Sequence, residues 1–107
     1  MRAARLDITA SSRPRLPHHV HLRFDALREK PIVLAPERVL WPDEISTAIL
    51  TRCDGQTTVC EMAEDFARDY AAPPAEIEAD IIAFLQDWAD RLLIEVATGE
   101  NGAGAQT

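Results

Sequence analysis

The hydrophobic positions of this chain first alternate and then adopt a helical spacing, and this change predicts its architecture. Three short apolar runs come first, at residues 19–25, 31–35 and 38–41. In the first run, Val20, Leu22 and Phe24 share one face while polar residues occupy the other. Strict alternation of this kind is typical of a half-buried strand. Three such strands joined by short turns predict an antiparallel meander whose first and third strands are edges.

The second half of the chain has helical periodicity. Asp43 is placed to cap a first helix, because its carboxylate can accept hydrogen bonds from first-turn amides. Thr58 and Glu61 form a capping box at the start of a second helix. Pro74 suits the first position of a third helix, which runs to about Leu92. The pattern therefore predicts an α+β fold of the winged helix-turn-helix type, with a three-stranded antiparallel sheet followed by three helices.

The 107 residues are predicted to form one domain with a segment on either side. Residues 1–16 lack a sustained period, and we expect a disordered leader or linker there. Residues 17–96 carry the pattern of the folded domain. Residues 92–96 either add a short extra strand or form the frayed end of the third helix. Residues 97–107 are rich in Gly and Ala, and we expect them to be disordered.

The charge of the chain is unevenly distributed. The net charge is −7, yet residues 1–38 carry eight Arg and Lys against four acids, a balance of +4. Residues 39–107 carry three Arg against fourteen acids, a balance of −11. An anionic partner is therefore expected at the strands rather than at the helices. No apolar run approaches the ~20 residues that cross a bilayer, and no signal peptide is evident, so we expect a cytoplasmic protein.

Winged helices commonly bind nucleic acid, but the third helix of this chain argues against that role. Its acidic residues are Glu76, Glu78, Asp80, Asp87 and Asp90, and its only basic residue is Arg91. Neutralising phosphates requires Lys and Arg, so a nucleic-acid partner is not expected. A DNA-binding or transcription-associated winged helix is the alternative hypothesis, and a purely structural subunit of a larger complex is a third.

Metal and catalytic chemistry have little support in the sequence. His18, His19 and His21 cluster on or near the first strand, but no further ligand is tied to them by spacing, and structural zinc takes four. We therefore expect exposed histidines without a metal. Cys53 and Cys60 lie seven residues apart, outside any C-x-x-C pattern, and we expect both to be small buried residues. Without a glycine-rich phosphate loop or a paired nucleophile and base, we predict neither enzymatic activity nor a cofactor.

Two features favour an interaction module. An edge strand has unpaired N–H and C=O groups that can accept another strand. On the third helix, Ile82, Ala89 and Leu93 lie on an apolar flank outside the main core stripe. Either this helix is buried on two sides, or the flank and the edge strand form a trough for an extended peptide. Trp41, at the end of the third strand, either anchors such a peptide or fills the core.

The sequence resembles the PqqD family of pyrroloquinoline quinone (PQQ) biosynthesis from about Arg15 to Val96. The segments that carry the resemblance are LAPERVLWPDEISTAIL, CDGQTTVCEMAEDFARDYAAP and IEADIIAFLQDWADRLLI. The most specific positions within them are the Pro36-Glu37 turn, Glu44, the Asp54-Gly55 helix stop with Thr58, and the Phe84-Leu85 run. Their order and spacing together are specific, although each alone is weak.

The resemblance implies a non-catalytic peptide chaperone without a cofactor. Members of this family are winged-helix-like domains known as RiPP recognition elements, which bind the ribosomally made precursor peptide PqqA. They present that peptide to PqqE, a radical-SAM enzyme that joins a Glu and a Tyr within it. In such domains the leader peptide adds as a strand to the third strand and packs against the third helix. The implied peptide-binding residues are Arg38, Val39, Leu40, Trp41, Ile82, Leu85 and Ala89. Both a monomer and a homodimer are compatible with the sequence.

Overall fold

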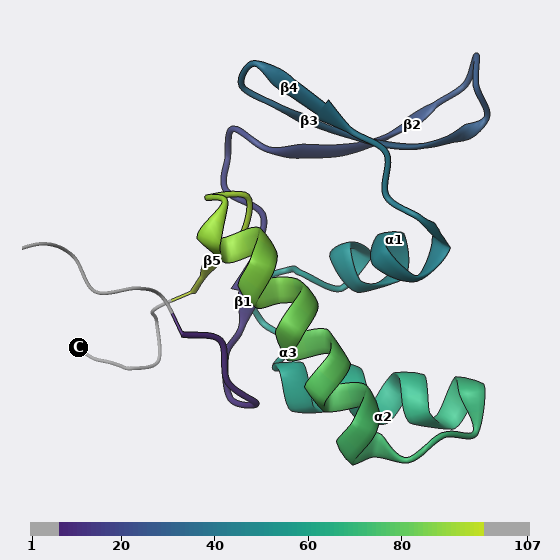
Figure 1. Cartoon of the computed structure of the whole chain (residues 1–107), viewed down its shortest axis with the longest axis vertical. Coiled ribbons are helices and arrows are strands. Elements are labelled where there is room, and N and C mark those ends of the chain that lie inside the picture. The colour runs from purple at the N-terminus through teal and green to yellow at the C-terminus, as the bar shows by residue number, and fades with distance from the viewer. Residues whose placement is uncertain (1–6, 98–107) are drawn as a thin grey trace, which may run out of the picture.

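A three-stranded sheet lies on one side of three helices in the computed structural model, which describes residues 7–97 (Figure 1). Its strands are β2 (His21–Asp25), β3 (Lys30–Ala35) and β4 (Arg38–Leu40). They pair antiparallel in the order β2-β3-β4. This order confirms the predicted meander, and it leaves β2 and β4 as the edges of the sheet.

One face of the sheet contributes to the core. Val33 pairs with Leu22 on one side and with Leu40 on the other, so all three share a face. Val33 is completely buried, and Leu22 and Leu40 pack against the core. Phe24 belongs to the same face but is 66% exposed near the end of the β2–β3 hairpin. The alternation in the sequence therefore predicts the inward face, although burial ends before the hairpin tip.

The helices begin where the sequence predicts. They are α1 (Glu44–Thr51), α2 (Val59–Tyr70) and α3 (Pro74–Asp90). At α1, Asp43 Oδ1 accepts a hydrogen bond from the Ser46 amide at 2.7 Å. At α2, the Glu61 amide donates to Thr58 Oγ1, and the Thr58 amide donates to Glu61 Oε1. Both predicted caps are thus confirmed, and together they satisfy first-turn amides that would otherwise lack partners.

An N-terminal segment packs against the helices and adds a second small sheet. Strand β1 (Pro14–Arg15) pairs antiparallel with β5 (Glu95–Val96). Further along this segment, the Ile8 side chain is 5% exposed, and the Ile8 amide donates to Gln86 Oε1 of α3 at 2.9 Å. Residues 7–16 therefore belong to the folded unit, which extends before the predicted start at residue 17. The predictions for residues 1–6 and 98–107 lie outside the described residues.

The two cysteines differ in their surroundings. Cys53 is buried as predicted, and burial raises the pKa of its thiol to about 12. The prediction is wrong for Cys60, which is exposed. Cys60 follows the buried Val59 on α2, and one residue turns a helix by about 100°, so its side chain leaves the buried stripe.

Neither a metal cluster nor a membrane span is found within residues 7–97. No group of three or more His, Cys, Asp and Glu side chains in this range is placed to hold a metal ion. The rings of His18 and His19 lie edge to face, with their centroids 5.4 Å apart. None of the helices in the described part of the chain has the length and apolar character needed to cross a membrane.

Candidate functional site

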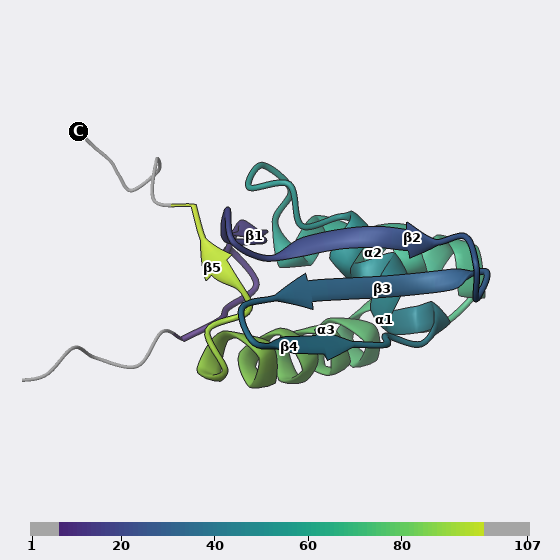
Figure 2. The same ribbon diagram turned by 90° about the horizontal axis from the view of Figure 1, so that it is seen from above.

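A hollow lies between the edge strand β4 and the C-terminal half of α3, and we call it the β4–α3 groove. Its lining residues are Val39, Leu40, Trp41, Pro42, Asp43, Ser46, Phe84, Trp88 and Arg91. Seen from above the sheet, β4 runs along α3 in the opposite direction, and α1 begins where β4 leads out of the sheet (Figure 2). Three elements therefore form the groove: a strand edge, a helix face and the first turn of a second helix.

The strand side of the groove offers unpaired backbone groups. Within residues 7–97, β4 pairs with β3 alone. Ala35 and Arg38 flank the two-residue turn at residues 36–37 and pair with each other. The two residues that flank such a turn form a hydrogen-bonded pair, and hydrogen-bonded and non-hydrogen-bonded pairs alternate along an antiparallel ladder. Val39, the next residue, therefore belongs to a non-hydrogen-bonded pair. The N–H and C=O of Val39 therefore point away from β3, toward the open edge.

The helix side of the groove is aromatic and cationic. Phe84, Trp88 and Arg91 are spaced by four and three residues, which places them on one face of α3. The ring centroids of Phe84 and Trp88 lie 5.2 Å apart. The Arg91 guanidinium carbon lies 5.6 Å from the centre of the Trp88 ring, and Arg91 Nη2 donates to Asp87 Oδ2 at 3.2 Å. This face can contact apolar side chains, and the Arg91 guanidinium on it is paired with Asp87.

The two ends of the groove carry opposite charges. At one end, Arg38 Nη2 donates to the backbone carbonyl oxygen of Arg91 at 3.0 Å, so the Arg38 guanidinium lies at the C-terminal end of α3. The Nε atom of Arg91 is buried without a hydrogen-bond partner in the described structure. At the other end, the hydrogen bond from the Ser46 amide holds the pKa of the Asp43 carboxyl below its ordinary value. A carboxylate on a bound chain is therefore favoured at the Arg38–Arg91 end.

Trp41 lies at the border of the groove rather than in the core. Its side chain is 44% exposed. The Arg28 guanidinium carbon and the Lys30 ammonium nitrogen lie 5.3 and 5.1 Å from the centre of its ring. These contacts come from the β2–β3 hairpin and fit cation–π interactions. The alternative that Trp41 fills the core is therefore wrong, and Trp41 is available beside the open edge.

The predicted site residues separate into two groups in the structure. On the strand side, Val39, Leu40 and Trp41 line the groove, and Arg38 lines a neighbouring hollow that it shares with Arg91. The predicted helix residues, Ile82, Leu85 and Ala89, are not among those that line the groove. Leu85 is completely buried and Ala89 is 6% exposed, so both belong to the core. Trp88 is buried as well, at 5% exposed, but it also lines the groove.

The helix residues beside β4 lie on another side of α3. At about 100° per residue, Phe84 and Ile82 are roughly 160° apart around the helix axis. Ile82 instead shares a side of α3 with Gln86, which accepts the hydrogen bond from the N-terminal segment. The sequence does contain a signal for the groove face, namely two aromatic residues and an arginine at helical spacing, Phe84, Trp88 and Arg91.

The fold and the groove define an α+β domain of the winged helix-turn-helix type with an open strand edge beside a helix. The family model described as Coenzyme PQQ synthesis protein D (PqqD) matches residues 32–94. The chain therefore belongs to the PqqD family, as its sequence predicts.

Relatives in bacteria support this membership. A PqqA binding protein of Rhodopseudomonas palustris strain HaA2 is 47% identical over 91 residues, which cover 85% of this chain and 89% of that protein. A bifunctional coenzyme PQQ synthesis protein C/D of Methylorubrum extorquens is 42% identical over 87 residues, or 81% of this chain and 23% of that protein. The fold of this chain thus occurs both alone and as one part of a longer protein.

Two solved structures share the fold. One is the solution NMR structure of the PqqD truncation of Methylobacterium extorquens PqqCD, described as a functional, stand-alone RiPP recognition element. It has a TM-score of 0.71 and 42% sequence identity, and the match covers 82% of this chain and 94% of that chain. The other is the crystal structure of PqqD from Xanthomonas campestris, with a TM-score of 0.50, 32% identity, and coverage of 80% and 96%.

Proposed function

We propose that this protein is the peptide-binding chaperone of PQQ biosynthesis, which binds the precursor peptide PqqA and presents it to the radical-SAM enzyme PqqE. Membership of the PqqD family and the PqqA-binding relatives support the peptide as the ligand. The observation that carries the proposal is the open edge of β4 beside the aromatic face of α3. The protein itself contributes recognition rather than catalysis, and it acts in the cytoplasm as a monomer or a homodimer.

The backbone of the peptide adds to the sheet as a fourth strand next to β4. Strand addition of this kind obtains affinity from main-chain hydrogen bonds and specificity from alternate side chains. Val39 offers the first outward N–H and C=O pair, and the alternation places the next at Trp41. Pro42 lacks an N–H, but at its position in the alternation that group would point toward β3 rather than toward the peptide. It therefore does not interrupt the hydrogen bonds to the peptide.

The side chains of the added strand meet two different surfaces. Because successive side chains point to opposite faces, every second one is directed toward the helices. Those side chains contact Phe84 and Trp88, while Leu85 and Ala89 support this face from within the core. The others extend the outer face of the sheet, where Val39 is 51% exposed.

The charge of the groove favours an acidic peptide. The strand half of the chain carries a net positive charge, and Arg38 and Arg91 lie at one end of the groove. The resemblance to the PqqD family implies an acidic precursor, so the two charges are complementary. Opposite charges steer association and fix the register of a bound chain, which gives the peptide one preferred position on β4.

Substitution of Val39 tests strand addition. Val39→Pro removes the outward N–H, while the hydrogen bonds between β3 and β4 are retained because that group does not take part in them. We expect the Kd for synthetic PqqA to rise by about tenfold or more. Val39→Thr is the matched control, since it keeps both the N–H and the preference for a strand. Isothermal titration calorimetry measures both, and circular dichroism confirms that each variant is folded. Equal affinity of the two variants would refute strand addition at β4.

A further inference from the structure

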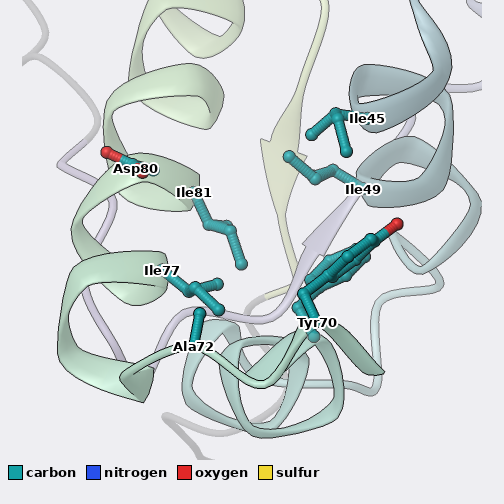
Figure 3. Close-up of a pocket in the computed structure, with 8 residues that line it drawn as sticks. Ile45, Ile49, Tyr70, Ala72, Ile77, Asp80 and Ile81 are labelled. Atoms are coloured by element: carbon teal, nitrogen blue, oxygen red, sulfur yellow. The ribbon is translucent and has the colours of Figure 1, made fainter. Parts of the chain in front are cut away.

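A second hollow lies among the three helices, away from β4, and we call it the three-helix pocket. Its lining residues are Ile45 and Ile49 of α1, Phe66 and Tyr70 of α2, Ala72, and Ile77, Asp80 and Ile81 of α3. Figure 3 shows the isoleucine side chains of α1 and α3 pointing toward one another across the pocket, with Tyr70 at one side. The lining is almost entirely apolar. Asp80 is the one acidic residue in it, and Figure 3 shows its carboxylate directed away from the isoleucine side chains.

The pocket is open to solvent and has room for one large side chain. Ile45 and Tyr70 are 52% and 54% exposed, so apolar surface remains in contact with water. Its volume is about 190 Å³, below the ~300–1,000 Å³ of typical small-molecule sites. An exposed apolar patch framed by polar residues is typical of a surface that meets another protein. These dimensions fit an inserted side chain better than a cofactor or metabolite.

The surroundings of the pocket are acidic. Glu76 lies one turn before Asp80 on α3, so the two carboxylates share a side of that helix. Glu44 precedes Ile45 in the first turn of α1. Arg52 lies near the pocket, with its guanidinium carbon 4.3 Å from the centre of the Phe66 ring. Arg52 is already paired with Asp69 at 4.0 Å, so the surroundings keep a negative charge.

We propose that the three-helix pocket docks the modifying enzyme, through an apolar side chain on its surface that is flanked by lysine or arginine. The charge pattern supports a basic partner, because an apolar anchor fills the pocket while its cationic neighbours meet Glu44, Glu76 and Asp80. A second copy of this chain would bring a helical half of net charge −11 against another of the same charge. Self-association through this face is therefore disfavoured.

This inference rests on the proposed function, because a chaperone must hold its peptide and its enzyme at the same time. A peptide on β4 occupies the face formed by Phe84, Trp88 and Arg91. The three-helix pocket instead uses residues of α1, α2 and the N-terminal half of α3, and it shares no lining residue with the β4–α3 groove. Both partners can consequently bind without displacing each other.

Substitution of Ile45 tests the pocket without disturbing the groove. Ile45→Asp places a carboxylate in the first turn of α1, where the helix dipole favours negative charge, so the variant should fold. We expect its Kd for purified PqqE to rise by about tenfold or more, since a central apolar contact is lost. Leu27→Asp is the matched control, because Leu27 is 93% exposed at the β2–β3 hairpin tip and does not line the pocket. Its affinity for PqqE should match that of the wild type.

Charge reversal gives an independent readout. Asp80→Lys should weaken PqqE binding by about three- to tenfold at low salt, and the difference should shrink as salt rises. Glu64→Lys makes the same change of charge on α2, at a residue that does not line the pocket, and should have a smaller effect. Equal effects of these two reversals, or an Ile45→Asp variant that binds PqqE like Leu27→Asp, would overturn the proposal.

Two further measurements distinguish this inference from the proposed function. Titration of each variant with PqqA should give wild-type affinity, so failure of the wild type to bind PqqA would refute the proposed function itself. If the wild type binds PqqA but not PqqE, the docking proposal fails while peptide binding stands. The second measurement is the oligomeric state of the wild type and of Ile45→Asp, determined by sedimentation velocity. A dimer that Ile45→Asp dissociates would identify a second copy as the occupant and overturn the proposal.

Discussion

The β4–α3 groove and the three-helix pocket share helix α3 but offer a partner different chemistry. The groove combines unpaired backbone of β4, two aromatic rings and the guanidinium of Arg91. The pocket combines isoleucine and aromatic side chains with one carboxylate, and no strand edge lines it. Backbone hydrogen-bonding groups select an extended chain regardless of its sequence, whereas a small apolar pocket selects a single side chain.

Helix α1 links the two regions. Its N-cap Asp43 and its residue Ser46 line the groove, whereas Ile45 and Ile49 line the pocket. The hydrogen bond between Asp43 and the Ser46 amide therefore positions both sites at once. The comparison teaches that α1 and α3 each contribute residues to both surfaces, while β4 completes the groove and α2 completes the pocket. The following changes separate these surfaces, beginning with the largest expected effect.

Among the changes that separate the two surfaces, loss of the aromatic face should weaken peptide binding the most. Phe84→Ala removes a ring that lines the groove, and we expect the Kd for PqqA to rise by about tenfold. Ile82→Ala is the matched control, because Ile82 is a half-buried residue of the same helix that does not line the groove. Its Kd should change by less than about twofold. Calorimetric titration gives both values, and urea unfolding measures the loss of stability in each variant.

The outcome of this pair decides which side of α3 meets the peptide. An Ile82→Ala variant that binds more weakly than Phe84→Ala would return the contact to the flank predicted from the sequence. Leu85→Glu is unsuitable for the same purpose, because Leu85 is completely buried and a carboxylate there would unfold the domain.

Removal of one charge at the groove should have a moderate effect. Arg38→Gln eliminates a guanidinium at the cationic end, and we expect a rise in Kd for PqqA of about three- to fivefold at low salt. The dependence of Kd on salt concentration should also become weaker. Arg23→Gln changes the net charge equally, but Arg23 lies on β2, at the other edge of the sheet. If both variants change the salt dependence alike, the effect comes from net charge rather than from the groove.

The smallest expected effect concerns pH and the cap of α1. Hydrogen bonding to the Ser46 amide lowers the pKa of Asp43 from its ordinary value of 3.8. The ionised cap thus adds stability that is fully present above about pH 4 and is lost as pH falls through the lowered pKa. Asp43→Asn keeps a capping oxygen but no charge, so the urea midpoint of the wild type should exceed that of the variant at pH 7. A difference that persists unchanged at pH 2 would contradict this explanation.

The sequence was sufficient to predict the elements whose signals are local. Alternation predicts β2, a short apolar run predicts β3, and the caps at Asp43 and Thr58 predict the starts of α1 and α2. These predictions succeed because each depends on residues within one turn or one strand. Strand β1 has only two residues and pairs with β5 at the other end of the chain, so no local pattern indicates it.

The helix side of the groove was harder to predict. The reason is the N-terminal segment that contains β1. Ile82 belongs to an apolar flank that appears free when residues 7–16 are taken as a leader. In the structure, the buried Ile8 and its hydrogen bond to Gln86 bring that segment onto α3. The sequence shows that α3 has apolar surface on more than one side, but it does not show which side its own chain covers. The edge strand was predictable because its position follows from the order of the meander.

Hydrogen exchange at the Val39 amide tests the central claim, the pairing of a peptide with β4, most directly. In the free protein this amide points away from β3, so we expect rapid exchange. With saturating PqqA, a hydrogen bond to the peptide should slow its exchange by about tenfold or more, while the Ile45 amide at the three-helix pocket stays unchanged. Saturation with PqqA that leaves exchange at Val39 unaffected would contradict the account.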